Sequence, residues 1–164
     1  MDKTVTIYCK NTQNYHDFPL GTSLLEIHNS LSINLKYQVV AARVNYKVED
    51  LNFLIYKPKD IEFIDTSTSS GMRVYVRSLS MVLSKAVSEL YPHTEIRIEH
   101  PISKGYYCRI EHLNEPLTTD IVNRIKAKMR EIISRNEPII CEEQQAEHVK
   151  KLFRNGTNNT SKDT

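Results

Sequence analysis

A run of six small polar residues, 66–71, divides the sequence into two regions that each carry their own hydrophobic pattern. The run has no apolar anchor and has the composition of a flexible connector. At 164 residues the chain is long enough for two small domains, each with a modest core. The sequence therefore predicts a first domain over residues 1–65, a linker over 66–71, a second domain over 72–156 and a flexible tail over 157–164.

The first region begins with the pattern of a half-buried strand. Val5, Ile7 and Cys9 alternate with polar residues, which is the period of two that a strand with one buried face requires. Asn11–Asn14 has turn chemistry, and residues 15–19 can return as the second strand of a hairpin.

A helix and further strands complete the pattern of the first region. Ser23 and Glu26 have the spacing of a capping box, which predicts a helix start because the two side chains satisfy free N–H groups. Residues 39–44 and 60–65 predict strands, whereas residues 47–50 indicate a short irregular piece. This order of elements favours a small α+β domain.

The second region predicts two amphipathic helices around a hairpin. Apolar residues recur at helical spacing over 72–91, and Pro92 ends that helix. Residues 95–98 and 106–110 alternate like paired strands, and a second helix opens near Thr118, which can cap it. A last helix is predicted from three apolar residues with a glycine stop, namely Ala146, Val149, Phe153 and Gly156.

Composition favours a folded protein of the cytoplasm. The chain is 40% hydrophobic, and its net charge is only +2 from 22 basic and 20 acidic residues, so any basic surface must be local. The odd number of cysteines, three, argues for a reducing compartment. No signal peptide and no apolar run of about 20 residues is present in the sequence, so no membrane partner is expected.

The sequence lacks the motifs of nucleotide and metal sites. Its four glycines are isolated, so no glycine-rich loop can cradle a phosphate. No Cys-x-x-Cys or His-x-x-x-His pair exists, and Cys141 with His148 is better explained by packing and a surface histidine than by zinc. We therefore expect no catalytic, cofactor-binding or metal-binding residue in this chain.

Two further groups of residues have side chains suited to a functional site. Cys108 with His100 or His112 has the residue types of a nucleophile and its base, but Cys108 shares a strand face with Tyr106 and Ile110, which predicts a core position. A local anion- or RNA-binding patch is conceivable from four basic residues: Arg73, Arg77, Lys85 and Lys104. A solvated helix face is the alternative, because acidic residues are interspersed nearby.

The first region resembles a TGS domain, the ubiquitin-like β-grasp module that precedes threonyl-tRNA synthetases. Residues 19–27, 42–45 and 60–64 carry this resemblance in their order and spacing. The second region resembles the domain that follows in those enzymes, the editing domain of the threonyl/alanyl-tRNA synthetase type. Leu90–Pro92, residues 104–107 and Leu117–Thr118 ahead of a helix carry that likeness. The resemblance implies an α+β protein of two small domains, the second of them incomplete.

One departure from the synthetase pattern bears on activity. Editing domains of this type carry His-x-x-x-His early in the long helix, and Arg77 and Met81 stand at those positions here. Arginine does not deprotonate near neutral pH and methionine has no proton to give, so neither replaces an imidazole in water activation or zinc binding. The later Cys-x-x-x-His half of the motif has no match in this chain either. Editing activity is therefore not expected.

The combined pattern is also similar to the amino-terminal region of uridine kinase-like P-loop nucleoside kinases, through residues 75–80, 97–100 and 103–108. This resemblance implies a non-catalytic regulatory or ligand-binding region, with a kinase domain in cis as its partner. ATP and magnesium would bind only in that downstream domain, which is absent from this sequence. The alternative is an RNA-binding module related to the front end of threonyl-tRNA synthetase, with RNA or a nucleotide as ligand. A residual hydrolase acting on charged tRNA is the third hypothesis.

Overall fold

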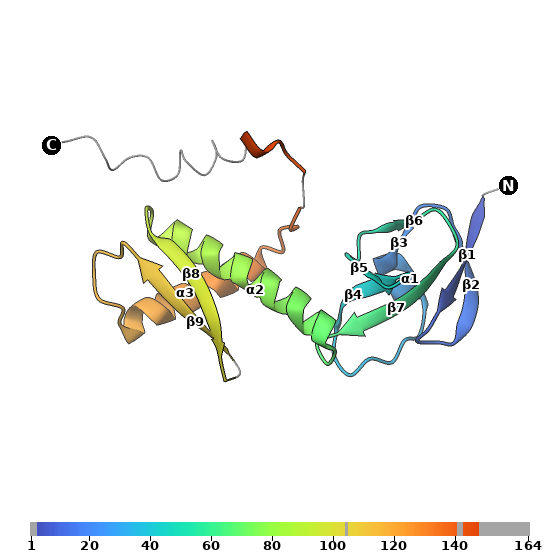
Figure 1. Ribbon diagram of the computed structural model, residues 1–164, viewed down its shortest axis with the longest axis horizontal. Helices are drawn as coiled ribbons and strands as arrows, with labels where there is room; N and C mark the ends of the chain where they lie inside the picture. The colour runs from blue at the N-terminus through green and yellow to red at the C-terminus, as the bar shows by residue number, and fades with distance from the viewer. Residues whose placement is uncertain (1–2, 104, 141–142, 148–164) are drawn as a thin grey trace. The chain divides into compact units, whose positions relative to one another are not determined.

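The computed structural model describes residues 3–103, 105–140 and 143–147 (Figure 1). The chain divides into two compact units, Met1–Ser78 and Leu79–Thr164, called the first and the second unit below. Both units combine helices with antiparallel strands, which confirms the predicted α+β class. Among the described residues, no helix has both the length and the hydropathy that a membrane span needs.

The first unit is built on a five-stranded sheet with the order β2-β1-β7-β4-β5. Strand β1 runs parallel to β7, and the other neighbours in this sheet are antiparallel. The bounds of the strands are Thr4–Cys9 for β1, Asn14–Pro19 for β2, Val39–Val44 for β4, Lys47–Glu49 for β5 and Lys59–Asp65 for β7. The parallel pairing of β1 with β7 is possible because the long connection between them, which includes α1, lets the chain return in the same direction.

Helix α1, Leu24–Ser30, begins at the capping box that the sequence predicts. The Ser23 hydroxyl accepts from the Glu26 N–H at 3.2 Å, and the Glu26 carboxylate accepts from the Ser23 N–H at 2.8 Å. Two short strands, β3 (Thr22–Ser23) and β6 (Leu54–Ile55), pair next to this helix start. The reciprocal bonds fix the place where the chain turns from strand to helix.

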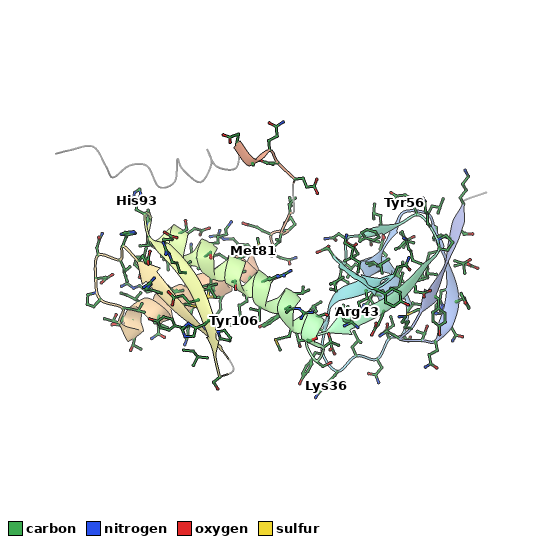
Figure 2. The ribbon with its side chains drawn as sticks, in the orientation of Figure 1. Lys36, Arg43, Tyr56, Met81, His93 and Tyr106 are labelled. Atoms are coloured by element: carbon green, nitrogen blue, oxygen red, sulfur yellow. The ribbon has the colours of Figure 1, made fainter. Side chains whose placement is uncertain are left out.

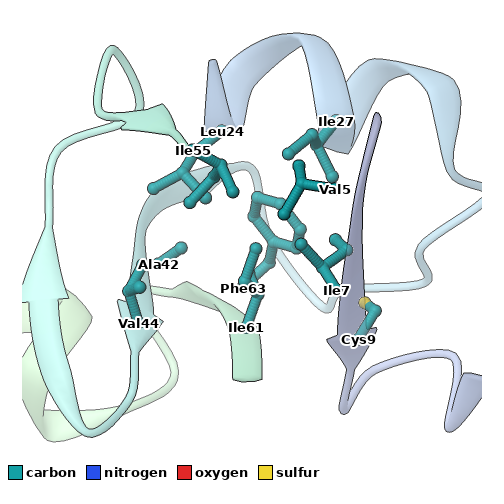
Figure 3. Packing of buried hydrophobic residues seen from close by; sticks show 10 residues of the cluster. All are labelled: Val5, Ile7, Cys9, Leu24, Ile27, Ala42, Val44, Ile55, Ile61 and Phe63. Carbon is teal, nitrogen blue, oxygen red and sulfur yellow. The ribbon is translucent and has the colours of Figure 1, made fainter. Parts of the chain in front are cut away.

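The core of the first unit lies between α1 and one face of the sheet (Figure 3). Phe63 of β7 is at its centre with 1% of its surface exposed, and Leu24 and Ile27 reach it from α1. The remaining core residues come from the strands: Val5, Ile7, Cys9, Ala42, Val44, Ile55 and Ile61. The buried positions in β1 confirm the period-two pattern from which that strand was predicted.

The second unit contains a hairpin, the later part of one helix and the whole of another. Helix α2 spans Ser69–Leu90 and so begins within the first unit, while α3 spans Thr119–Ser134. Strands β8 (Glu95–Ile102) and β9 (Gly105–Glu111) form the hairpin. Its core joins both helices through five buried residues: Ala86, Val87, Ile121, Ile125 and Ile132. The N-cap Thr118 accepts from the Ile121 N–H, as a hydroxyl cap should.

Two details of the predicted secondary structure are wrong. Residues 47–49 form β5 instead of an irregular piece, because Asn45 and Tyr46 adopt positive φ angles of 46° and 74° and make a tight turn between β4 and β5. The predicted connector 66–71 is not a free linker, since Ser69–Gly71 are the first turn of α2. Residues 72–78, expected in the second domain, belong to the first unit by their contacts.

Some of the predicted segments lie outside the described residues. These are most of the last predicted helix, the tail 157–164 and Cys141. Independent folding of the two predicted domains stays a prediction.

Gly71 allows α2 to start close to the end of β7. A Cβ atom at this position would overlap the backbone carbonyl of Asp65 and would lie 3.1 Å from the Thr68 hydroxyl. Backbone cannot move aside as a flexible side chain can, so the first turn of α2 requires a glycine here. Close approach, and not φ, is the reason, because a positive φ is found only for Gly21 among the described glycines.

We predict that Gly71→Ala destabilises the first unit by about 1–3 kcal/mol through this overlap. The sign of the change in the free energy of unfolding is informative, because a glycine-to-alanine substitution in an unobstructed helix would instead stabilise the protein by about 0.5–1 kcal/mol. Urea unfolding, with amide hydrogen exchange of residues 59–65, measures the change. Gly105→Ala is the control, since its nearest neighbour is 3.9 Å away, and a stabilised Gly71→Ala would contradict the account.

Candidate nucleic-acid interface

The Asp65 carboxylate joins two segments of the first unit that are distant in sequence. Asp65 ends β7 and has only 2% of its surface exposed. One carboxylate oxygen accepts from the Tyr37 N–H at 2.8 Å, and the other accepts from the Ser67 N–H at 2.8 Å and from the Ser67 hydroxyl. A single side chain therefore holds the segment before β4 against the turn before α2.

These hydrogen bonds also decide the charge state of Asp65. The Ser67 hydroxyl and then the Tyr37 N–H lower the pKa of the Asp65 carboxyl, and they outweigh the opposing effect of burial. Donors that point at a carboxylate stabilise its ionised form. Asp65 is thus a buried anion whose lone pairs are already used by its neighbours.

The first turn of α2 is fixed by a second set of polar contacts. The Thr68 hydroxyl accepts from the Gly71 N–H at 3.0 Å and so caps the helix. The buried Ser70 hydroxyl accepts from Arg43 and from Arg73, each at 3.2 Å. Arg43 also pairs with Glu62 of β7 at 3.1 Å. The start of α2 is consequently a rigid part of the first unit.

A hollow of about 410 Å³ opens between the two segments that Asp65 joins, and we call it the tyrosine pocket. Its lining residues are Tyr37, Gln38, Val40, Thr66, Met72 and Tyr75. Both rings are partly open to solvent, because Tyr37 is 54% and Tyr75 49% exposed. Lys36, labelled in Figure 2, places its ammonium nitrogen 5.4 Å from the centroid of the Tyr37 ring.

The basic residues predicted as a patch fall into different units of the chain. Arg73 and Arg77 are exposed and lie four residues apart on α2, so they share a face of that helix within the first unit. Lys85 belongs to the second unit and is paired with Glu89 at 3.8 Å and Glu137 at 3.3 Å. Lys104 lies outside the described residues.

Sequence reasoning missed Lys36 and the two tyrosines of the pocket. Lys36 and Tyr37 precede β4 in an irregular segment, where no periodicity marks a functional residue. The pairing of Val39 with Asp65 and the hydrogen bond from Tyr37 to Asp65, across 28 residues of sequence, bring them to the start of α2. An aromatic residue next to a lysine in a loop was the one available signal.

The positions of the editing histidines are occupied by residues without that chemistry. Arg77 is exposed, and Met81 is 54% exposed on the same helix. In the parts of the chain that the structure describes, no group of three histidine, cysteine or acidic side chains has the geometry to hold a metal ion.

The hairpin face that contains Cys108 is less buried than expected. Cys108 is half-buried and its thiol donates to the Tyr106 carbonyl at 3.7 Å, while Tyr106 is 50% exposed. The cause is a register shift between Ile98 and Pro101, beyond which the alternation is lost. Of the described hairpin residues, Ile96 and Ile110, which pair with each other, are the ones that pack on the core.

Comparison with known proteins gives relatives that include threonine–tRNA ligases of several bacteria. Over 139 residues, 82% of the chain, it is 30% identical to a threonine–tRNA ligase of Desulforamulus reducens. It is 32% identical to that of Bartonella bacilliformis and 28% identical to that of Bacillus velezensis, each over 84% of the chain. No family model matches the sequence. The chain resembles the amino-terminal region of threonyl-tRNA synthetases.

This resemblance supports the TGS-like and synthetase-like assignments made from the sequence. The chain spans only about a fifth of the length of these relatives, 21–22%. The relatives favour the synthetase-related alternative over the nucleoside-kinase reading, and the kinase relationship stays a prediction without support from them. The same holds for ATP and magnesium in a downstream domain.

The pKa of Asp65 generates a prediction on stability and pH. Because the folded-state pKa is lowered, the carboxylate stabilises the first unit fully above 3.8, its ordinary pKa, and this contribution is lost as the pH falls through the lower folded value. We expect Asp65→Asn to lower the melting temperature at pH 7 and to reduce the loss of stability between about pH 5 and pH 2.

Asp60→Asn is the matched control, since Asp60 is an exposed aspartate of the same strand. Thermal unfolding at a series of pH values separates the two variants. Equal pH profiles for Asp65→Asn and the parent chain would contradict the assigned role of Asp65.

Proposed function

We propose that this chain is an RNA-binding module related to the front end of threonyl-tRNA synthetase, which contacts tRNA-like RNA and carries out no editing. Similarity to threonine–tRNA ligases along 82% of the chain is the observation that carries this proposal. A module that keeps the synthetase-like pattern across both units, while the editing positions hold Arg77 and Met81, is better suited to binding than to hydrolysis.

Local charge in the first unit suits contacts with phosphate groups. Lys36, Arg73 and Arg77 carry positive charge around the start of α2. Glu62 is neutralised by Arg43, so these three cations are opposed by one buried carboxylate, that of Asp65. The unbalanced charge is therefore positive, which attracts a polyanion at short range even though the whole chain carries only +2.

Arginine at position 77 changes the role of that position. An imidazole there would activate water or bind zinc, whereas a guanidinium stays protonated and offers fixed N–H donors to phosphate oxygens. Binding of this kind positions RNA without reading its sequence. The proposal thus assigns the helix face of Arg73 and Arg77 to the RNA backbone.

We predict that Arg77→Glu weakens binding of an unmodified tRNA by about tenfold at low salt. The slope of the logarithm of the binding constant against the logarithm of the salt concentration should fall in magnitude by about 1, which corresponds to one lost phosphate contact. Fluorescence anisotropy with labelled tRNA at several salt concentrations measures both quantities.

Lys57→Glu is the charge-matched control. Lys57 is exposed and precedes β7, whose seven residues separate it by about 20 Å from Asp65 at the other end of the strand. If both variants lost the same affinity for tRNA, the effect would come from net charge alone and not from the position of Arg77. Lack of any salt-dependent binding by the parent chain would end the proposal.

A further inference from the structure

We infer that the tyrosine pocket binds an unpaired nucleobase together with its adjoining phosphate. This inference rests on the proposed function and adds to it a stacking site in the first unit, next to the charged face of α2. It predicts a preference of the chain for RNA with unpaired nucleotides over blunt duplex RNA.

Two aromatic rings face the same hollow from different elements. Tyr37 comes from the segment before β4 and Tyr75 from the second turn of α2, and both are about half exposed. A tyrosine ring stacks on the flat face of any base, so such rings bind unpaired nucleotides with little regard to sequence. The hollow, about 410 Å³, falls within the range of about 300–1,000 Å³ that is usual for small-molecule sites.

Polar groups of the pocket suit the edge of a base. Gln38 carries an amide with both donors and an acceptor, and Thr66 carries a hydroxyl that can do either. Val40 and Met72 supply apolar surface between them. This mixture of apolar walls and a few polar groups is the composition of a site for a flat heterocycle.

Two cationic side chains lie close to the rings, where they can bind a phosphate attached to a stacked base. Lys36 lies 5.4 Å from the Tyr37 ring, and Arg73 follows Met72 directly in α2. Asp65 is buried and is not among the lining residues of the pocket, so Lys36 and Arg73 outnumber it as charges near the rings. Ring and cation together match a nucleotide better than they match an uncharged aromatic ligand.

The pocket is held in its shape before any ligand binds. Asp65 fixes the Tyr37 wall to the turn that contains Thr66, and the Thr68 cap fixes the helix that carries Met72 and Tyr75. A site that needs no rearrangement loses less entropy on binding. Bases within a duplex are already stacked on both faces, so only an unpaired nucleotide or a free one can present a face to these rings.

Another group of tyrosines provides a matched control. Tyr8 and Tyr15 of β1 and β2 lie with their ring centroids 5.0 Å apart, and Tyr46 lies under Lys10. Their shallow hollow also contains Asp60, and Asp17 lies nearby, bonded to Thr6 at 2.5 Å. Exposed carboxylates beside these rings disfavour a phosphate, so the inference does not extend to them.

The test uses tryptophan as a stacking reporter, because the chain contains none. Tyr75→Trp places the reporter in the tyrosine pocket, and Tyr15→Trp places it on the sheet. Three probes are titrated into each variant: an RNA hairpin with a four-nucleotide unpaired 3′ end, the same hairpin with a blunt end, and AMP.

We expect the unpaired hairpin to quench Tyr75→Trp and to leave Tyr15→Trp unchanged. In an anisotropy assay, Tyr37→Ala with Tyr75→Ala should weaken the unpaired hairpin by about tenfold and should leave the blunt hairpin nearly unchanged. Circular dichroism of each variant confirms folding. If the double alanine variant unfolds the first unit, Tyr75→Leu is used to compare the two hairpins instead, because leucine is apolar and favours a helix.

The outcomes separate the pocket from the proposed function. Equal binding of both hairpins without quenching of Tyr75→Trp overturns the pocket, while Arg77-dependent binding would still support an RNA module. Quenching by AMP without binding of either RNA supports a nucleotide pocket and overturns the RNA function. Quenching of both reporters to the same extent overturns the assignment of stacking to this pocket.

Discussion

The buried Asp65 carboxylate is the interaction on which the first unit and its candidate site depend. It ends the central strand β7 and holds the segment of Tyr37 on one side and the turn of Ser67 on the other. An ionised carboxylate with 2% exposure is stable only because donors surround it. Gly71 then lets α2 start directly above the Asp65 carbonyl, so strand end, loop and helix start form one rigid junction.

This junction explains how a chain with a net charge of only +2 can have a surface suited to RNA. Three cations and two tyrosines gather at the start of α2, whereas the nearby acids are used in structural bonds. Several basic residues of the second unit are instead paired with acids, as Lys85 is with Glu89 and Glu137. The proposed function rests on the resemblance to the front end of threonyl-tRNA synthetases, and it assigns Arg77 to phosphate binding in place of editing chemistry.

Sequence patterns predicted the parts of this structure that local chemistry decides. The alternation of Val5, Ile7 and Cys9 and the Ser23–Glu26 capping box are local signals, and both are confirmed. Strand β5 was missed because its turn uses Asn45 and Tyr46 at positive φ without a glycine. The start of α2 and the tyrosine pocket were missed because the bonds of Asp65 to residues far along the chain create them, and no periodicity reports such bonds. Of the predicted patch residues, Arg73 and Arg77 lie in the first unit and Lys85 in the second, while Lys104 lies outside the described residues.

The proposed function requires that this chain holds tRNA without chemistry at the 3′ end of that RNA. One measurement tests both halves: the full chain is incubated with tRNA mischarged with a radiolabelled amino acid, and retained tRNA and released amino acid are counted together. The account predicts retention that falls steeply with salt, with ester hydrolysis equal to that of a sample without protein. Hydrolysis above that background, or failure to retain tRNA at low salt, would contradict it.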